Sequence, residues 1–356
     1  MELQYQRIDL ALRHSWAIAT DVGRGGGKSV YPVVVVQLRD AHGRSGIGEA
    51  SPSSQYGESH ETVSAFLSRV DPARLSFDDP AASLAYVESV APGNHPAKCA
   101  LDIALLDGAA RAARQSLCEF LGLGPFAEGR HVSSFTIGID TPEKMAAKTE
   151  EAAAYALLKM KLGSPTDAEN LAAVQRAAGG RPLRVDANAA WKSKEEALRH
   201  IEWLASQGGI EFVEQPMPPG LPTADWAWLK ERSPLPLFGD ELYQGAADAA
   251  RCAECVHGVN VKLVKTGGVT RGKEALVAAR AQGLQTMLGC MIESSVLITA
   301  AAHLAALTDH LDLDGNVLIT NDPYDGVRNI GGRLTFEGVE DAWGLRVQRR
   351  PGACQA

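Results

Sequence analysis

The chain has 356 residues, of which 45% are hydrophobic and 22% are charged, and its formal net charge is −8. A chain of this length and mixture can bury a large core, which excludes a protein that is mainly disordered. The acidic balance argues against nucleic acid or an anionic membrane surface as the main partner, because both attract clustered Lys and Arg.

The sequence also lacks the patterns of membrane and secreted proteins. No run approaches the roughly 18 apolar residues of a transmembrane helix, and the first residues do not read as a signal peptide. Six cysteines are few for this length. We therefore expect a reduced, cytoplasmic protein with no membrane partner.

The first 125 residues combine strand and helix patterns. A Gly-rich stretch at residues 20–29 separates the first two expected strands and does not favour regular structure. Residues 58–125 are mostly helical in pattern, most clearly over residues 97–122. These features predict an α+β domain over residues 1–125. Its strands are expected at residues 4–10, 31–38 and 46–50.

From residue 126 onward, short apolar runs alternate with helical segments. Their ends step by about 25 residues, the size of one strand–helix unit. Eight such units predict a (β/α) barrel over residues 126–330. An open doubly wound sheet is the alternative, but it usually shows a Gly-rich turn that opens a helix. The runs lie at residues 134–138, 157–161, 183–186, 210–214, 237–240, 259–262, 285–289 and 311–314.

Polar side chains follow these runs at their carboxyl ends. In a barrel this end carries the active site, so residues that are distant in the sequence converge there. The alternative is that a strand end simply meets solvent; this suffices for one residue but is weak for so many consecutive units. The residues are Lys159, Lys161, Asp186, Asn188, Glu214, Asp240, Glu241, Lys262, Asp312 and Asp314.

Three acids on adjacent units, Asp186, Glu214 and Asp240, form what we call the acidic trio. Three carboxylates around one point repel one another unless a cation lies between them. Mg²⁺ suits this set, since it prefers oxygen ligands and keeps positions for water or substrate; Ca²⁺ usually recruits more protein oxygens. The alternative is that the trio pairs with barrel lysines and binds no metal.

Lysines are expected on two sides of the same pocket. Lys159 and Lys161 lie two residues apart on one predicted strand, so their side chains share a face. Neighbouring ammonium groups lower each other's pKa, and a lysine base at neutral pH needs a pKa of roughly 7–8 instead of about 10.4. Lys262 follows a strand on the opposite wall of the barrel.

This arrangement fits proton abstraction next to a carboxylate. Removing that proton creates an enediolate, whose negative charge a divalent metal stabilises. One lysine then removes the proton from one face, and the other returns a proton to the opposite face. The product is the epimer of the substrate.

Taken together, Lys159-Met-Lys161, the acidic trio and residues 259–268 resemble the enolase superfamily, muconate-lactonizing subgroup. The resemblance implies a modified TIM-type (β/α)7β barrel with an α+β N-terminal capping domain, whose lid loop lies near residues 20–29. It also implies that residues 331–356 return to pack on the cap. Residues 46–52, 56–58 and 100–107 are similar to segments of the family's capping domain.

The resemblance implies a role for each chemical group. Lys161 and Lys262 would be the acid/base pair, and Lys159 would tune Lys161 and contact the substrate carboxylate. The acidic trio would hold one Mg²⁺ per subunit.

Residues 311–315 resemble the eighth strand of the dipeptide epimerases, whose paired aspartates hold the free α-ammonium group of a dipeptide. Two carboxylates on one face, Asp312 and Asp314, suit an ammonium group with three hydrogen bonds to donate. The alternative is an Asp-rich turn that closes the barrel.

Three more residues are expected around the substrate. Residues 291–294 resemble the family's seventh-strand segment, in which Ile292 would line a partly apolar pocket and Glu293 would neighbour Lys262. Arg24 in the lid loop is the candidate contact for an acidic substrate side chain, with Lys28 as the other choice.

These interpretations predict a Mg²⁺-dependent dipeptide epimerase, with L-Ala-D/L-Glu as the default substrate and peptidoglycan peptide metabolism as its setting. The sequence leaves open whether the protein forms a homo-oligomer. Alternatives within the superfamily are o-succinylbenzoate synthase, another cycloisomerase or an N-acylamino acid racemase. Alternatives of other classes are a lyase with a Schiff-base lysine and a barrel that only binds peptides.

Overall fold

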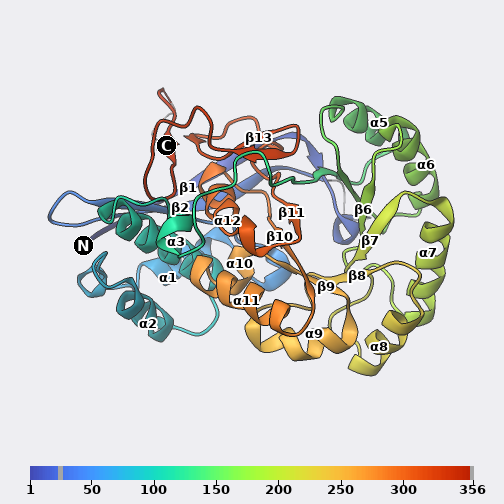
Figure 1. Cartoon of the computed structure of the whole chain (residues 1–356), viewed down its shortest axis with the longest axis horizontal. Coiled ribbons are helices and arrows are strands. Elements are labelled where there is room, and N and C mark those ends of the chain that lie inside the picture. Colours follow the sequence, from blue (N-terminus) through green and yellow to red (C-terminus); the bar gives the residue numbers. More distant parts are fainter. Residues whose placement is uncertain (23–26, 353–356) are drawn as a thin grey trace.

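The computed structural model describes residues 1–22 and 27–352 (Figure 1). An N-terminal domain with an antiparallel sheet lies beside a barrel of parallel strands, and helices surround the barrel on the outside (Figure 1). The predicted fold class is confirmed, whereas the exact domain boundaries stay predictions. No helix within the described ranges is long and apolar enough to cross a membrane.

The N-terminal sheet has three antiparallel strands in the order β1-β2-β3. They are β1 (Glu2–Trp16), β2 (Lys28–Arg39) and β3 (Ser45–Ala50). Four consecutive valines of β2, residues 33–36, are buried, since both faces of this strand are covered. The helical elements of this domain are η1 (Ala19–Asp21), η2 (Ser54–Tyr56), α1 (His60–Leu67), η3 (Pro72–Arg74), α2 (Pro80–Val90), α3 (His95–Ala112) and α4 (Leu117–Phe120).

Two glycines let helix α3 lie directly on strand β3. A Cβ atom at Gly46 or Gly48 would overlap the backbone carbonyl of Ala104 or Ala100, respectively. The Gly-Ile-Gly pattern of residues 46–48 is therefore a requirement of close packing between this strand and this helix.

The helical pattern predicted over residues 97–122 is interrupted. Helix α3 ends at Ala112, Arg114 adopts a left-handed conformation with φ 54°, and α4 begins at Leu117. Glu119 accepts hydrogen bonds from the backbone N–H and the hydroxyl of Ser116, and so forms part of a capping box. This local N-cap competes with continuation of the first helix.

The barrel contains eight parallel strands paired in chain order. Ser133 and Leu311 form an isolated parallel bridge between the chain before the first strand and the last strand, which brings the two edges of the sheet together. The strands are β4 (Phe135–Ile137), β5 (Leu158–Lys161), β6 (Leu183–Asp186), β7 (Ile210–Glu214), β8 (Leu237–Gly239), β9 (Gly258–Val261), β10 (Gln285–Gly289) and β11 (His310–Asp312).

Each of the eight predicted runs coincides with one of these strands. The intervening helices are α5 (Pro142–Glu151), α6 (Asp167–Ala178), α7 (Lys194–Gln207), α8 (Thr223–Arg232), η4 (Ala246–Asp248), α9 (Ala249–Cys255), α10 (Leu263–Thr266), α11 (Val269–Ala281), α12 (Ser295–Ala302) and η5 (Ala305–Leu307). Within the described part of the chain, β11 is followed by short strands and no further helix. They are β12 (Tyr324–Asp325), β13 (Arg328–Ile330), β14 (Arg333–Thr335) and β15 (Gln348–Arg349).

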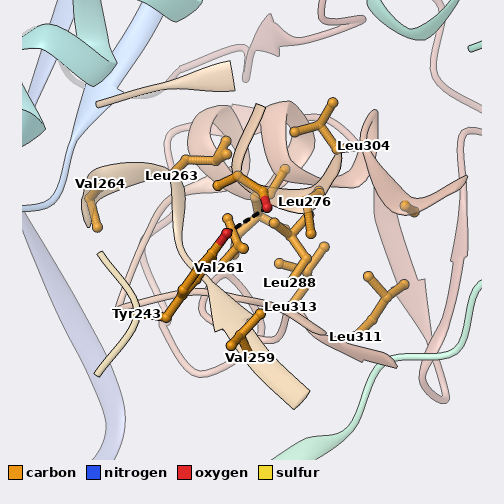
Figure 2. Packing of buried hydrophobic residues seen from close by; sticks show 14 of the residues in the cluster. Tyr243, Val259, Val261, Leu263, Val264, Leu276, Leu288, Leu304, Leu311 and Leu313 are labelled. Carbon is orange, nitrogen blue, oxygen red and sulfur yellow. Dashed lines mark hydrogen bonds between the residues drawn. The ribbon is translucent and has the colours of Figure 1, made fainter. Parts of the chain in front are cut away.

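The barrel strands are buried on both faces, as expected of a parallel sheet covered by helices. Figure 2 shows part of this core, where Val259 and Val261 of β9 lie among the side chains of neighbouring elements. Tyr243 lies in the same cluster, and its hydroxyl donates a hydrogen bond to the carbonyl of Ala275 at 2.6 Å.

The C-terminal segment packs against helices α3 and α4. The backbone N–H of Leu345 donates to Asp107 of α3 at 2.8 Å, and Arg111 pairs with Asp341 at 2.7 Å. His303, at the end of α12, contacts the same region: its Nδ1 accepts from the N–H of Cys118, and its Nε2 lies 3.0 Å from the carbonyl of Leu345. Both contacts are satisfied by a neutral ring protonated at Nε2.

We expect the folded state to lose stability as the pH is lowered, because of His303. Burial lowers the pKa of His303 to about 4, from an ordinary value of 6.5. Between these values the unfolded chain binds a proton that the folded chain does not, so acidification from pH 6.5 to pH 4 favours unfolding, by up to about 3 kcal/mol. Denaturant unfolding at several pH values measures this slope.

His303→Gln removes the titrating group, and we expect the dependence on pH to be shallower in this range. Comparing slopes separates titration from the packing that the variant loses. Parallel curves for wild type and variant would contradict the assignment.

Candidate active site

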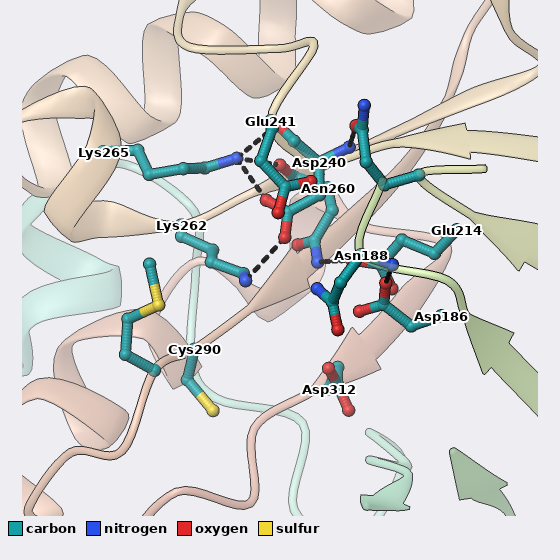
Figure 3. A network of polar contacts seen from close by, with 12 residues as sticks. Asp186, Asn188, Glu214, Asp240, Glu241, Asn260, Lys262, Lys265, Cys290 and Asp312 are labelled. Carbon is teal, nitrogen blue, oxygen red and sulfur yellow. Dashed lines mark hydrogen bonds and ion pairs between the residues drawn. The ribbon is translucent and has the colours of Figure 1, made fainter. Parts of the chain in front are cut away.

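The acidic trio converges at the carboxyl ends of three adjacent strands. Asp186 ends β6, Glu214 ends β7, and Asp240 directly follows β8. All three side chains are buried, and one carboxylate oxygen of each lies within 4.8 Å of the others. Figure 3 shows these acids within a network of polar contacts.

Lysines face the acidic trio from two walls of the barrel. On β5, Lys161 Nζ lies 2.6 Å from Asp186 Oδ2. Lys262 follows β9, four strands away in the sheet, and its Nζ lies 2.7 Å from Asp240 Oδ2. The two predicted bases therefore contact different members of the same acidic cluster.

Lys159 lies deeper than Lys161 and contacts three carboxylates. Its Nζ lies 2.7 Å from Glu214 Oε2, 2.7 Å from Asp312 Oδ2 and 3.2 Å from Asp186 Oδ2. This lysine therefore joins the acidic trio to the Asp312 side of the site.

These carboxylates dominate the charge state of the lysines. Burial lowers the pKa of Lys159, but the facing acids outweigh burial and raise the pKa well above its ordinary value. Burial and Asp240 have the same opposing effects on Lys262, with the same net direction. In this charge arrangement the acids hold Lys159 and Lys262 as ammonium groups, and the lowered pKa expected of a lysine base stays a prediction.

Within the acidic trio, the pKa of Asp240 and that of Glu214 shift in opposite directions. Burial raises the pKa of Asp240, but Lys262 and Lys265 outweigh it and hold the pKa well below its ordinary value. For Glu214, burial and the charge of Asp186 raise the pKa. The trio therefore depends on cations around it to remain charged.

Lys265 is a fourth lysine of the site to which the sequence analysis gave no role. Its Nζ donates to Asp240 Oδ1 at 2.5 Å and to the Asp240 carbonyl at 2.6 Å, with longer bonds to the carbonyls of Tyr243 and Asn260. Asn260 in turn donates to Glu214 Oε1 at 2.7 Å. The signal for Lys265 was its spacing of three residues from Lys262, which is the N-cap residue of the helical turn that contains Lys265.

Asp312 and Asp314 lie at the other side of the site in different environments. Asp312 accepts from Lys159 and from the hydroxyl of Ser134, each at 2.7 Å, while Asp314 accepts from the backbone N–H of Thr136 at 2.6 Å. Burial raises the pKa of Asp312, but Lys159 outweighs it and brings the value to about 2. Burial and Asp312 raise the pKa of Asp314 to about 7.

Three of the lysines, Lys159, Lys161 and Lys262, and the paired aspartates line one cavity of about 80 Å³ between the barrel and the N-terminal domain. Gln55 of η2 reaches across this boundary and donates to Glu241 Oε1 at 2.7 Å. The other oxygen of Glu241 is buried and has no hydrogen-bond partner among the residues that the structure describes. The N-terminal domain thus supplies part of the wall, including Trp16, Ile18, Tyr31 and Pro52.

Of the residues expected around the substrate side chain, only some can be placed relative to the cavity. Ile292 lines the cavity, whereas Glu293 is buried and accepts a hydrogen bond from the N–H of Met291 at 2.8 Å. Arg24 lies outside the described residues. The Lys28 ammonium is 5.2 Å from the centre of the Tyr31 ring. The roles of these residues stay predictions.

The acidic trio has the composition and convergence of a divalent metal site. Three buried oxygen donors around one point match the ligands that hard cations prefer. The structure also contains the lysine pairing on which the metal-free alternative depends. Ion pairing alone, however, does not require oxygens of three carboxylates to gather within 4.8 Å of one another.

Comparison with known proteins identifies the family. Residues 143–353 match the family profile described as Enolase C-terminal domain-like. Residues 22–122 match that of the Mandelate racemase / muconate lactonizing enzyme, N-terminal domain. The chain belongs to the enolase superfamily. The predicted resemblance is confirmed.

Relatives within the superfamily narrow the enzyme class. The chain is 51% identical over 350 residues to the L-Ala-D/L-amino acid epimerase of Pedosphaera parvula, covering 98% of this chain and all of that protein. Its fold is similar to a substrate-liganded complex of the L-Ala-D/L-Glu epimerase from Bacillus subtilis, with TM-score 0.88, 27% identity and 97% of each chain covered.

It is also similar to a dipeptide epimerase from Enterococcus faecalis V583 complexed with Mg and the dipeptide L-Leu-L-Tyr, with TM-score 0.85 and 26% identity. That match covers 98% of this chain and 99% of the other. Epimerases are isomerases, and the prediction that this chain is an isomerase is confirmed.

A divalent cation should stabilise the folded protein through the acidic trio. Binding to the folded state alone raises stability by about 2.7 kcal/mol at 100 times the dissociation constant. We expect millimolar Mg²⁺ to raise the melting temperature of wild type and to leave that of Glu214→Gln nearly unchanged, because the variant lacks one charged ligand.

Glu143→Gln, on the exposed first turn of α5, is a matched control that should respond like wild type. An equal shift for Glu214→Gln and wild type would rule out the trio as the binding site.

Proposed function

We propose that this enzyme epimerises dipeptides at the α-carbon of the C-terminal residue, with one Mg²⁺ per subunit. The substrate would be L-Ala-D/L-Glu or a related L-Ala-Xaa dipeptide. The names of the relatives support this class of substrate. The observation that carries the proposal is the placement of Lys161 and Lys262 at different members of one buried acidic cluster.

Inversion of a carbon centre requires proton transfer on two faces. Lys161 comes from β5 and Lys262 from the end of β9, four strands apart in an eight-stranded barrel. Both line the same cavity. A substrate α-carbon between them would lose its proton to one amine and receive a proton from the other, which leaves the atom count unchanged and the configuration inverted.

The acidic trio would hold Mg²⁺, which supplies positive charge for the substrate carboxylate when it is bound. Lys159 also places an ammonium group in this part of the cavity, in line with its proposed contact to the substrate carboxylate. The protein's own residues would thus fix the carboxylate end and present one amine to each face of the α-carbon.

Asp312 and Asp314 would recognise the free α-ammonium group of the dipeptide. Both line the cavity; Asp312 already pairs with Lys159, whereas Asp314 has no lysine or arginine partner among the described contacts. An ammonium group donates up to three hydrogen bonds, which two neighbouring carboxylates can accept. Substrates of the cycloisomerase alternatives carry no such ammonium group.

Removal of either base should abolish inversion and leave exchange at one face. In D₂O we expect Lys262→Ala to lose epimerisation by at least about 100-fold while one epimer still exchanges its α-proton through Lys161. Lys161→Ala should lose epimerisation to a similar extent, while the other epimer still exchanges its α-proton through Lys262. Mass spectrometry with chiral separation measures deuterium and configuration together.

Lys144→Ala, in which the replaced side chain is 68% exposed, is the control and should behave like wild type. Borohydride trapping of a covalent lysine adduct would instead support a Schiff-base lyase, and binding of peptides without any exchange would support a non-catalytic barrel.

Recognition of the ammonium group is tested separately. Asp314→Asn keeps the shape of the side chain but removes its negative charge. We expect the KM for the free dipeptide to rise by about 10- to 100-fold, as is typical for loss of a charged hydrogen bond, with a smaller effect on kcat.

The N-acetylated dipeptide serves as the matched substrate, because it lacks the charge that Asp314 would recognise. Wild type should epimerise it poorly. Equal turnover of the free and acetylated dipeptides would favour an N-acylamino acid racemase.

A further inference from the structure

Helix α11 of the barrel receives its N-terminal cap from the N-terminal domain. Asp102 of α3 accepts hydrogen bonds from the backbone N–H groups of Val269 at 2.5 Å and Thr270 at 3.2 Å. These are the first two residues of α11, whose N–H groups have no partner within the helix. Asp102 is itself buried, at 2% exposure.

Among the described contacts, no side chain of the barrel caps the start of α11. The N-cap residue of α11 is Gly268, with φ 123°, where helices usually place Ser, Thr, Asp or Asn. A Cβ atom at Gly268 would overlap the carboxylate of Asp102. The carboxylate from the other domain therefore occupies the space in which a local cap would lie.

This cap lies close in sequence to a proposed base. Lys262 is the N-cap of the short helix α10, and α10 leads through Gly267 and Gly268 directly into α11. Helix α10 packs against α3. A displacement of the start of α11 would therefore be transmitted to Lys262 through a linker of only a few residues.

The linker is fixed at two points. On the barrel side, Lys265 in α10 donates to the carbonyl and the carboxylate of Asp240, as Figure 3 shows beside Lys262. On the side of the N-terminal domain, Asp102 holds the start of α11. Lys161 lies within β5, which hydrogen-bonds to barrel strands. The end of this segment meets the N-terminal domain by packing, where Gly163 lies against Ala19, and among the described contacts no hydrogen bond joins the two.

We propose that Asp102 is a positioning residue for Lys262, so that one of the two bases depends on docking of the N-terminal domain. The inference rests on the proposed function, in which Lys262 and Lys161 serve opposite faces of the α-carbon. It gives the N-terminal domain a role in proton transfer besides forming the wall of the cavity.

A second buried acid of the N-terminal domain also caps the start of a barrel helix. Glu49 of β3 is fully buried and accepts hydrogen bonds from the N–H and the hydroxyl of Ser294, the N-cap residue of α12. This helix follows the segment that carries Ile292. The N-terminal domain thus holds the starts of two consecutive barrel helices, α11 and α12.

The test measures α-proton exchange for each epimer separately in D₂O with Mg²⁺. Lys262→Ala first identifies the epimer whose proton Lys262 removes. For Asp102→Ala we expect exchange of that epimer to slow by about 10- to 100-fold, the effect of a misplacement near 1 Å. The other epimer, which depends on Lys161, should exchange within about threefold of wild type.

Two further variants separate positioning from general loss of structure. Asp102→Asn keeps an acceptor for the α11 N–H groups and should restore exchange close to wild type, because Asn caps helices about as well as Asp. Asp107→Ala is the matched control: this buried acid on α3 accepts from Ile47 and Leu345 instead of the barrel segment, so its loss should affect both epimers equally.

The outcomes distinguish this inference from the proposed function. Equal slowing of both epimers in Asp102→Ala, with wild type active, would overturn the positioning role and leave the function intact. Absence of exchange in wild type would overturn both. Should Asp102→Ala fail to fold, Gly268→Ala displaces the same carboxylate from the barrel side, and it must show the same preference for one epimer.

Discussion

Burial of several carboxylates at one point is the constraint on which the rest of this site depends. A charged group inside a protein is tolerated only when other charges or hydrogen bonds compensate for lost hydration. Four lysines face the acidic trio and Asp312, so four amino groups oppose four carboxyl groups. The lysines are Lys159, Lys161, Lys262 and Lys265.

Acids of the same pocket that have no lysine partner among the described contacts have raised pKa values. Burial and neighbouring acids raise the pKa of Asp314 and of Glu241 to about 7. The barrel mouth thus contains acids whose pKa the lysines lower, such as Asp240 and Asp312, and two acids, Asp314 and Glu241, that can hold a proton near neutrality. A cationic ligand group would favour the charged form of the second set.

Much of the fold and the centre of the site could be predicted from the sequence. The apolar runs identified all eight barrel strands, because parallel strands covered by helices are apolar over their whole length. The rule that polar residues gather at carboxyl ends then predicted that Lys161, Lys262 and the acidic trio lie close together, while their roles stay predictions. Contacts between domains could not be predicted: nothing near Asp102 or Glu49 in the sequence signals that each binds a helix start far along the chain. Lys265 was missed because the direction of its side chain depends on the turn of α10.

The cross-domain caps also affect how the chain folds during synthesis. Asp102 and its partner Val269 are separated by 167 residues. At a ribosomal rate of about 5–20 residues per second, roughly ten to thirty seconds pass between their appearance. During that interval the carboxylates of the N-terminal domain have no helix to cap and must remain hydrated, so its final packing waits for the last third of the barrel to emerge.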